Sequence, residues 1–198
     1  MKCVVIGSGA FGFAIAVNLL KNGNDVTVWC SSKDKLNEIQ SGKEIIPGIK
    51  IPTEMKFTDN IKEAVIDADV IYLMTSAKYI GDVTKKINKY AKKDAVYCIG
   101  SKGIEQGSCE FVHEVFKKNS NNSNYAVISG PSFAVDLASG EPIGFSLAAS
   151  NRRTSKLIIE TLSSNSVKLR KSSDMIGVEL CGSIKNVIAV AAGIITGL

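Results

Sequence analysis

The chain has 198 residues, 45% of them hydrophobic, and carries 24 Lys and Arg against 19 Asp and Glu, for a formal charge of +5. This length supports one full domain plus the beginning of a second, and the composition excludes an intrinsically disordered protein. The mild charge, with no basic tract interleaved with aromatics, speaks against nucleic-acid binding.

The N-terminus shows no signal-peptide pattern, and the longest apolar run, residues 187–198, is shorter than the ~20 residues of a membrane span. We therefore expect a cytoplasmic protein without membrane insertion. Five scattered cysteines, no two of them in a CxxC pair, predict reduced structural thiols rather than a metal site. The single histidine, His113, leaves proton chemistry mainly to lysines or carboxylates.

Short runs rich in Val, Ile, Tyr and Cys alternate with amphipathic segments along most of the chain. The runs predict strands over residues 3–6, 25–29, 69–75, 95–99, 125–129, 143–149 and 166–172. The segments between them predict helices over residues 11–22, 33–40, 61–67, 79–90, 109–118 and 152–163. This alternation predicts an α/β fold over residues 1–172, with a doubly wound, Rossmann-like, mostly parallel sheet.

The pattern changes at residues 173–198, where one long helix is predicted to begin at a Ser173 or Asp174 cap. This helix is apolar nearly all round, as expected for a helix in the middle of a helical domain. We therefore interpret it as the first helix of an all-α C-terminal domain.

The sequence GSGAFG, residues 7–12, lies between the first predicted strand and helix. In that context Gly7 makes a tight turn, Gly9 lets the backbone approach a pyrophosphate, and Gly12 allows close packing of helix and strand. The free N–H groups of the helix then favour the phosphates. This motif predicts binding of a nicotinamide dinucleotide.

Cys30, Ser31, Ser32 and Lys33 follow the second strand, where an acid usually binds the ribose of NAD. An acid there would repel a 2′-phosphate, so its absence permits NADP as well as NAD. Lys33 is either a phosphate contact or a solvated residue at a helix start, and the sequence leaves both interpretations open.

Ligands of a parallel sheet bind beyond the carboxyl ends of its strands, which directs attention to two further loops. Lys102 lies in SKGIE, residues 101–105, which follows the fourth predicted strand. SGPSFA, residues 129–134, follows the fifth, and Ser132 is predicted to cap a helix that begins at Phe133. In the long helix, Lys185 has apolar neighbours, and burial there would lower its pKa toward the range useful for proton transfer.

GSGAFGFAIA, SKGIE, SGPSFA and GVELCGSIKNVIAVAAGIITGL together resemble the bacterial-type NAD(P)-dependent glycerol-3-phosphate dehydrogenases. The resemblance runs from residue 1 to 198 and implies a chain that lacks most of the C-terminal substrate domain. It makes Lys185 the proton acceptor, and gives Lys102 contacts to both cofactor and substrate. It places the substrate on Gly130, Ser132 and Lys185, and the cofactor on Ala10, Phe11 and Ala134. Together with the residues at the strand ends, the predicted cofactor site comprises Gly7, Gly9, Ala10, Phe11, Gly12, Ser31, Lys102 and Ala134.

The chain departs from the family pattern at several positions. Ala10 stands where a nucleotide-contacting serine is usual, Ser31 and Ser32 replace basic residues, and Ser76 and Ala77 replace a proline and its polar neighbour. Asp136 stands in for a glutamate. The serines at positions 31 and 32 bear on the strength of any preference for NADP, and Ala10 leaves the pyrophosphate to the backbone N–H groups.

The resemblance implies interconversion of dihydroxyacetone phosphate and sn-glycerol 3-phosphate with NAD or NADP, feeding glycerophospholipid synthesis. The apolar helix at residues 174–198, left uncovered, predicts a homo-oligomer or aggregation. Two alternatives stay open: a catalytically incomplete NAD(P)-binding fragment, and a reductase of another small keto acid.

Overall fold

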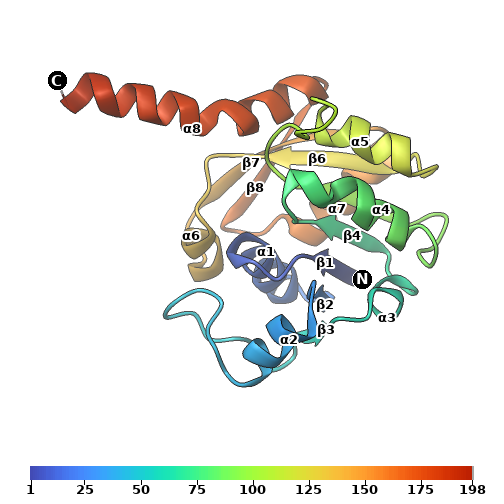
Figure 1. Cartoon of the computed structure of the whole chain (residues 1–198). Coiled ribbons are helices and arrows are strands. Elements are labelled where there is room, and N and C mark those ends of the chain that lie inside the picture. The colour runs from blue at the N-terminus through green and yellow to red at the C-terminus, as the bar shows by residue number, and fades with distance from the viewer. Residues whose placement is uncertain (198) are drawn as a thin grey trace.

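The computed structural model describes residues 1–197 as a single sheet of eight strands with helices on both faces (Figure 1). The strands are β1 (Lys2–Ile6), β2 (Asp25–Trp29), β3 (Lys56–Thr58), β4 (Val70–Leu73), β5 (Val96–Ile99), β6 (Tyr125–Ser129), β7 (Ile143–Ala149) and β8 (Val167–Ser172). The helices are α1 (Ala10–Lys21), α2 (Lys33–Gln40), α3 (Ile61–Val65), α4 (Ile80–Ile87), α5 (Val112–Asn119), α6 (Ala134–Ser139), α7 (Arg152–Leu162) and α8 (Met175–Gly197).

The strand order, β3-β2-β1-β4-β5-β6-β7-β8, confirms the doubly wound, mostly parallel sheet. Only the β6–β7 pair is antiparallel. The chain winds outward in one direction from β1 to β3 and in the other from β4 onward, so the order reverses between β1 and β4. Sequence reasoning missed β3, because three residues are too few to show an alternating pattern.

Alternate strand residues divide the apolar interior into two clusters, one on each face of the sheet. Val5 and Tyr72 belong to the cluster formed with α1, α6 and α7. Ile6 and Leu73 belong to the cluster formed with α3, α4 and α5. Burial of both faces explains why the strands are nearly continuous apolar runs.

Two predicted helix starts are wrong by a few residues. The helix expected from residue 109 begins at Val112, because Cys109 has a φ of 56° in the left-handed region and cannot continue a right-handed helix. The helix expected to follow a Ser132 cap begins at Ala134, with Phe133 at the cap position and no side-chain cap hydrogen bond.

α8 starts as predicted, since Asp174 Oδ1 accepts a hydrogen bond of 2.8 Å from the Gly177 N–H. Its first two turns lie over β6 and β7, and Val178 is buried there. The remainder projects beyond the sheet (Figure 1), where Val187 is 70% exposed and Ile195 76% exposed. Most of this apolar helix is therefore uncovered in the described structure; Leu198, its predicted end, lies outside the described residues.

By length and composition α8 could also cross a membrane, although the longest uninterrupted apolar run in the sequence is shorter than such a span. Only 11% of its most apolar stretch is buried, so packing in the described structure does not account for its apolar character.

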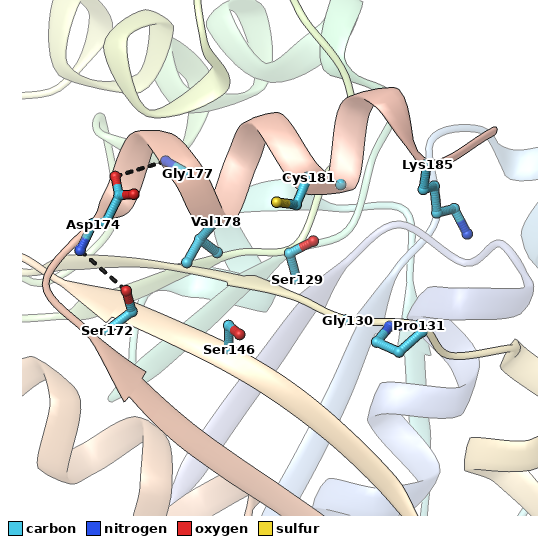
Figure 2. A pocket seen from close by; sticks show the side chains of 11 residues that line it. Ser129, Gly130, Pro131, Ser146, Ser172, Asp174, Gly177, Val178, Cys181 and Lys185 are labelled. Carbon is cyan, nitrogen blue, oxygen red and sulfur yellow. Dashed lines mark hydrogen bonds between the residues drawn. The ribbon is translucent and has the colours of Figure 1, made fainter. Parts of the chain in front are cut away.

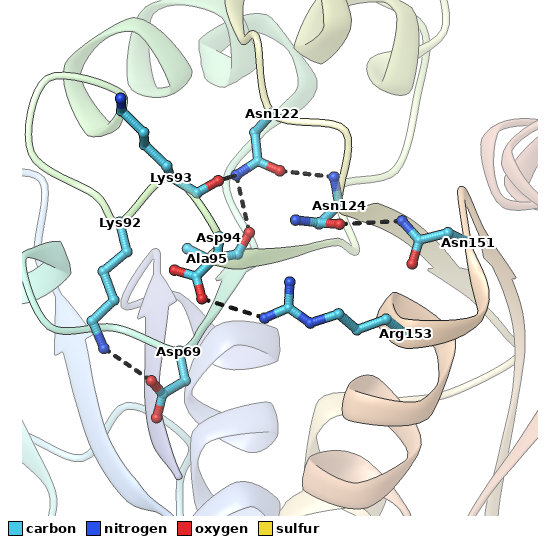
Figure 3. A network of polar contacts seen from close by, with 9 residues as sticks. All are labelled: Asp69, Lys92, Lys93, Asp94, Ala95, Asn122, Asn124, Asn151 and Arg153. Atoms are coloured by element: carbon cyan, nitrogen blue, oxygen red, sulfur yellow. Dashed lines mark hydrogen bonds and ion pairs between the residues drawn. The ribbon is translucent and has the colours of Figure 1, made fainter.

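A polar network closes the edge of the sheet at which the parallel strands begin (Figure 3). The Asn122 side chain donates to the carbonyls of Lys93 and Ala95, at 3.1 and 3.0 Å. Lys92 pairs with Asp69 at 2.9 Å. These contacts tie together the loops that precede β4, β5 and β6.

Candidate functional site

The glycine loop between β1 and α1 lies where the strand order reverses, which is where open α/β sheets bind ligands. Gly7 has a φ of +122°, and a Cβ there would lie 2.8 Å from the Met74 carbonyl oxygen. A Cβ on Gly12 would lie 2.0 Å from the Gly7 carbonyl oxygen. Both positions therefore require glycine, for the turn and for the close approach of α1.

Gly9 differs from these two, because a Cβ there would meet nothing within 4 Å. It is the N-cap of α1, where no side chain caps the helix and the first turn contains no acid. The N–H groups of Ala10 and Phe11 thus begin a helix whose positive dipole end faces open space. This cradle fits the pyrophosphate of a dinucleotide.

The end of β2 lies beside this loop, since the Gly7 N–H donates to the Trp29 carbonyl at 3.2 Å. Ser31 follows as an exposed residue. The Ser32 hydroxyl accepts from the Lys35 N–H at 3.3 Å, so it is already used as the cap of α2. Of the two serines, Ser31 is the one placed to meet a ribose.

Lys102 lies on a loop that is fastened to the end of β4. The Gly100 N–H and the Ser101 hydroxyl both donate to the Leu73 carbonyl, at 3.0 and 3.3 Å. Gly103 then takes a φ of +120°. As a result the Lys102 Nζ lies 5.1 Å from the centre of the Phe11 ring, next to the glycine loop.

Lys185 of α8 meets Lys102 at this point, although 83 positions separate them in the chain. Burial lowers the pKa of Lys102 to about 8, and the neighbouring Lys185 contributes to the shift. The sequence predicts an apolar setting around Lys185. That setting is wrong: Lys185 is half-buried and Ile188 is 59% exposed, because α8 leaves the sheet here.

A cavity of about 400 Å³ extends from Lys185 beneath the first turns of α8 (Figure 2). Lys185 and Pro131 lie at one end, and Asp174 and Ser172 at the other. Its polar lining also includes the hydroxyls of Ser129 and Ser146. The cavity is therefore open to a small polar molecule, with a cation at one end.

The residues predicted around SGPSFA lie at the same edge. Gly130 lines the cavity, and a Cβ there would lie 2.3 Å from the Gly144 carbonyl oxygen, so only glycine fits. The Ser132 hydroxyl is buried and has no hydrogen-bond partner in the described structure. Ala134 begins α6, which packs against α1 behind the glycine loop.

The structure thus brings the glycine loop, Lys102 and Lys185 together, and joins Lys185 to Gly130 through the cavity. Sequence reasoning missed Ser146 and Glu179, and it included Ser129 only as the first residue of SGPSFA. The two serines face inward from neighbouring strands, at a register that only strand pairing reveals. Glu179 is a buried acid in an apolar helix, and this isolated charge was the available signal.

Comparison with known proteins identifies the family of the chain. Residues 2–155 match the family model described as NAD-dependent glycerol-3-phosphate dehydrogenase N-terminus, and residues 174–198 match the corresponding C-terminus model. The chain therefore belongs to the NAD-dependent glycerol-3-phosphate dehydrogenase family.

Relatives named glycerol-3-phosphate dehydrogenase [NAD(P)+] include those of Fusobacterium nucleatum, at 35% identity over 100% of this chain, and Bacillus subtilis, at 34% over 100%. The crystal structure of glycerol-3-phosphate dehydrogenase from Coxiella burnetii is 32% identical over 98% of this chain, with a TM-score of 0.90. The chain spans 61%, 59% and 61% of these three proteins, respectively.

Proposed function

We propose that the chain interconverts dihydroxyacetone phosphate and sn-glycerol 3-phosphate, with NAD or NADP as the hydride carrier. The observation that carries this proposal is the meeting of Lys102 and Lys185 between the glycine loop and the polar cavity. Two cations at that point suit a substrate that bears a phosphate and develops negative charge on an oxygen.

The cofactor would be held by the backbone of Gly7, Gly9 and Gly12, by the N–H groups of Ala10 and Phe11, and by Ser31 and Ala134. When bound, its nicotinamide supplies or accepts the hydride. With no acid directly after β2, the site tolerates a 2′-phosphate, so both cofactors fit.

Lys185 would act as the acid and base of the reaction. As an ammonium, its Nζ donates a proton to the carbonyl oxygen of the ketone as the substrate is reduced. In the reverse direction the neutral amine takes the proton of the hydroxyl group.

Lys102 would stabilise the charge that develops on that oxygen. Its loop is held by two hydrogen bonds to the Leu73 carbonyl, so its position needs little reorganisation. Fixed positive charge in a site shielded from water contributes strongly to such reactions.

The substrate phosphate would lie in the cavity. Gly130 lines the cavity where the backbone packs closely on β7, and the unpaired Ser132 hydroxyl is available as a nearby donor. Ser129 and Ser146 would orient the remaining hydroxyl groups.

One assay tests the proposal: oxidation of NADPH and of NADH by the purified chain in the presence of dihydroxyacetone phosphate. Turnover that depends on the ketone is the expected result. Cofactor binding without turnover would contradict it and favour the alternative, an NAD(P)-binding fragment, to which the 61% coverage of the relatives points. Preferential reduction of another keto acid would contradict the substrate assignment.

We further propose that residues 1–172 form the dinucleotide-binding domain and that 173–198 begin the substrate domain. On this interpretation α8 is a domain-core helix and not a membrane span, in a cytoplasmic protein that forms homo-oligomers and feeds glycerophospholipid synthesis. The match of residues 174–198 to the family's C-terminus model supports the assignment of α8.

A further inference from the structure

Outside the site just described, Glu179 and His113 form a buried polar pair between α8 and α5. Glu179 is 4% exposed and His113 9% exposed. Glu179 Oε1 accepts a hydrogen bond of 2.9 Å from the His113 backbone N–H, and Oε2 pairs with the His113 Nδ1. Burial raises the pKa of Glu179, which shows the cost of placing a carboxylate here.

This carboxylate caps α5 from a distance of 66 positions along the chain. The residue at the cap position of α5 is Phe111, whose side chain has no acceptor, so the helix cannot satisfy this N–H with its own cap. A negative charge near a helix N-terminus is also favoured by the helix dipole. The one other acid facing the pair, Glu114 in the first turn of α5, bonds instead to the Phe111 N–H at 3.1 Å.

Glu179 lies in the short part of α8 that is in contact with the sheet. Before it, Val178 belongs to the apolar cluster that also contains Val112 and Phe116 of α5. After it, Gly182 lies so close to β6 that a Cβ would be 2.5 Å from the Ser129 hydroxyl. Lys185 follows within one turn, where α8 has already left the sheet.

The position of Lys185 is thus set by very few contacts. Val178 is apolar and permits small rotations of the helix, and Gly182 presents no side chain. The Glu179 carboxylate is directional, because its two oxygens bond to two different groups of one residue. A rotation of α8 about its axis would break these bonds and carry Lys185 away from Lys102.

We propose that Glu179, held by His113, is a positioning residue that fixes the rotation of α8 and thereby keeps Lys185 beside Lys102. Glu179 is not itself among the residues that line the cavity. The inference rests on the proposed function only for the chemical role of Lys185. The placement of Lys185 beside Lys102 can be tested without measuring turnover.

The experiment follows the titration of Lys102 in the chain labelled with ¹³C at the lysine Cε, with the signal assigned by Lys102→Arg. In Glu179→Ala, Lys185 should move away and the pKa of Lys102 should rise from about 8 toward the normal lysine value. Lys185→Met should raise it in the same direction. In the Lys185→Met background, adding Glu179→Ala should then cause no further rise.

Glu160→Ala is the matched control, since Glu160 is a glutamate in an exposed ion pair on α7, and it should leave the titration unchanged. Glu179→Gln, which keeps an acceptor for the His113 N–H, provides a second variant if Glu179→Ala fails to fold. It should raise the pKa of Lys102 by less and should retain slow hydrogen exchange at the His113 amide.

A Lys102 titration that is the same in wild type and in folded Glu179 variants would overturn the proposal. An equal shift of Lys102 by Glu179→Ala with and without Lys185 would overturn it as well. A coupled shift in a chain that shows no turnover of dihydroxyacetone phosphate would instead support the positioning role and contradict the proposed function.

Discussion

At the scale of single residues, the site depends on two lysines with different surroundings. Lys102 is half-buried on a loop tied to β4, and Lys185 stands on a helix that is leaving the sheet. The two ammonium groups repel each other, and no carboxylate contacts either of them in the described structure. On the proposed function, this pair is the site that binds the anionic substrate.

Replacing Lys185 with Ala should lower turnover by about 10²–10⁴-fold, the usual contribution of a positioned acid–base group. Binding of the cofactor should change little, because the glycine loop is intact. Steady-state kinetics and the fluorescence of bound NADH measure the two effects. Lys168→Ala, on the edge strand β8, is the control, and a Lys185→Ala chain with near-normal turnover would rule out the assigned role.

Binding of phosphate-bearing ligands should weaken as the pH rises through about 8, the pKa of Lys102. Below that pH Lys102 is charged and attracts the anion; above it the amine is neutral. With a pKa near 8, going from pH 7 to pH 9 should lower the affinity for dihydroxyacetone phosphate by about tenfold.

Isothermal titration calorimetry at both pH values measures this change. In Lys102→Met the affinity should already be low at pH 7 and should fall much less by pH 9. An equal pH dependence in wild type and Lys102→Met would assign the effect to another group.

At the scale of elements, the glycine loop and α8 differ in how closely they pack against the sheet. The loop brings α1 as close to β1 and β4 as the backbone allows, through Gly7 and Gly12. α8 in contrast is anchored over two turns only and extends beyond them. Substitutions in the glycine loop should therefore lower the stability of the fold, whereas substitutions in α8 should change the alignment of the site.

Gly12→Ala should destabilise the fold by about 1–3 kcal/mol, the usual range for overpacking, because the new Cβ would overlap the Gly7 carbonyl. Gly9→Ala should leave stability nearly unchanged, since its Cβ would point into open space, but should weaken cofactor binding. Denaturant unfolding of the cofactor-free chain and NADH titration separate the two effects. Gly144→Ala, which also meets nothing within 4 Å, is the control; a stable Gly12→Ala would contradict the packing argument.

At the scale of the whole molecule, an α/β domain with two complete apolar clusters carries a helix that is largely uncovered (Figure 1). Its exposed side chains include Val187, Val190 and Ile194, which share one face at positions i, i+3 and i+7. Contiguous apolar surface of this kind is unusual on a monomer and promotes association.

The chain should therefore self-associate through α8, as dimers or larger species. Light scattering after size exclusion should show this, and the triple variant Val187→Gln, Val190→Gln, Ile194→Gln should shift it to the monomer. Substituting three exposed residues on α7, Arg153, Lys156 and Glu160, with Gln provides the control. A wild-type chain that elutes as a monodisperse monomer would contradict the prediction.

Much of this protein is determined by local sequence. The α/β alternation, the GSGAFG turn and the Asp174 cap each depend on residues within a few positions of one another, so they predicted the sheet, the loop and the start of α8. The short β3 and the start of α5 were not predictable in this way: β3 exists through pairing with β2, and Cys109 takes a left-handed backbone conformation that its residue type does not signal.

The candidate site also combines features that the local sequence indicates with features that only the tertiary fold determines. The residue types and order of the glycine loop are enough by themselves to indicate a dinucleotide, whereas the proton-transfer role of Lys185 rests on the family resemblance. Only the tertiary fold decided that Lys102 has the lowered pKa, that Ser129 and Ser146 share a cavity, and that Glu179 caps α5. Burial, strand register and helix rotation arise from contacts between distant segments, and these three results depend on such contacts.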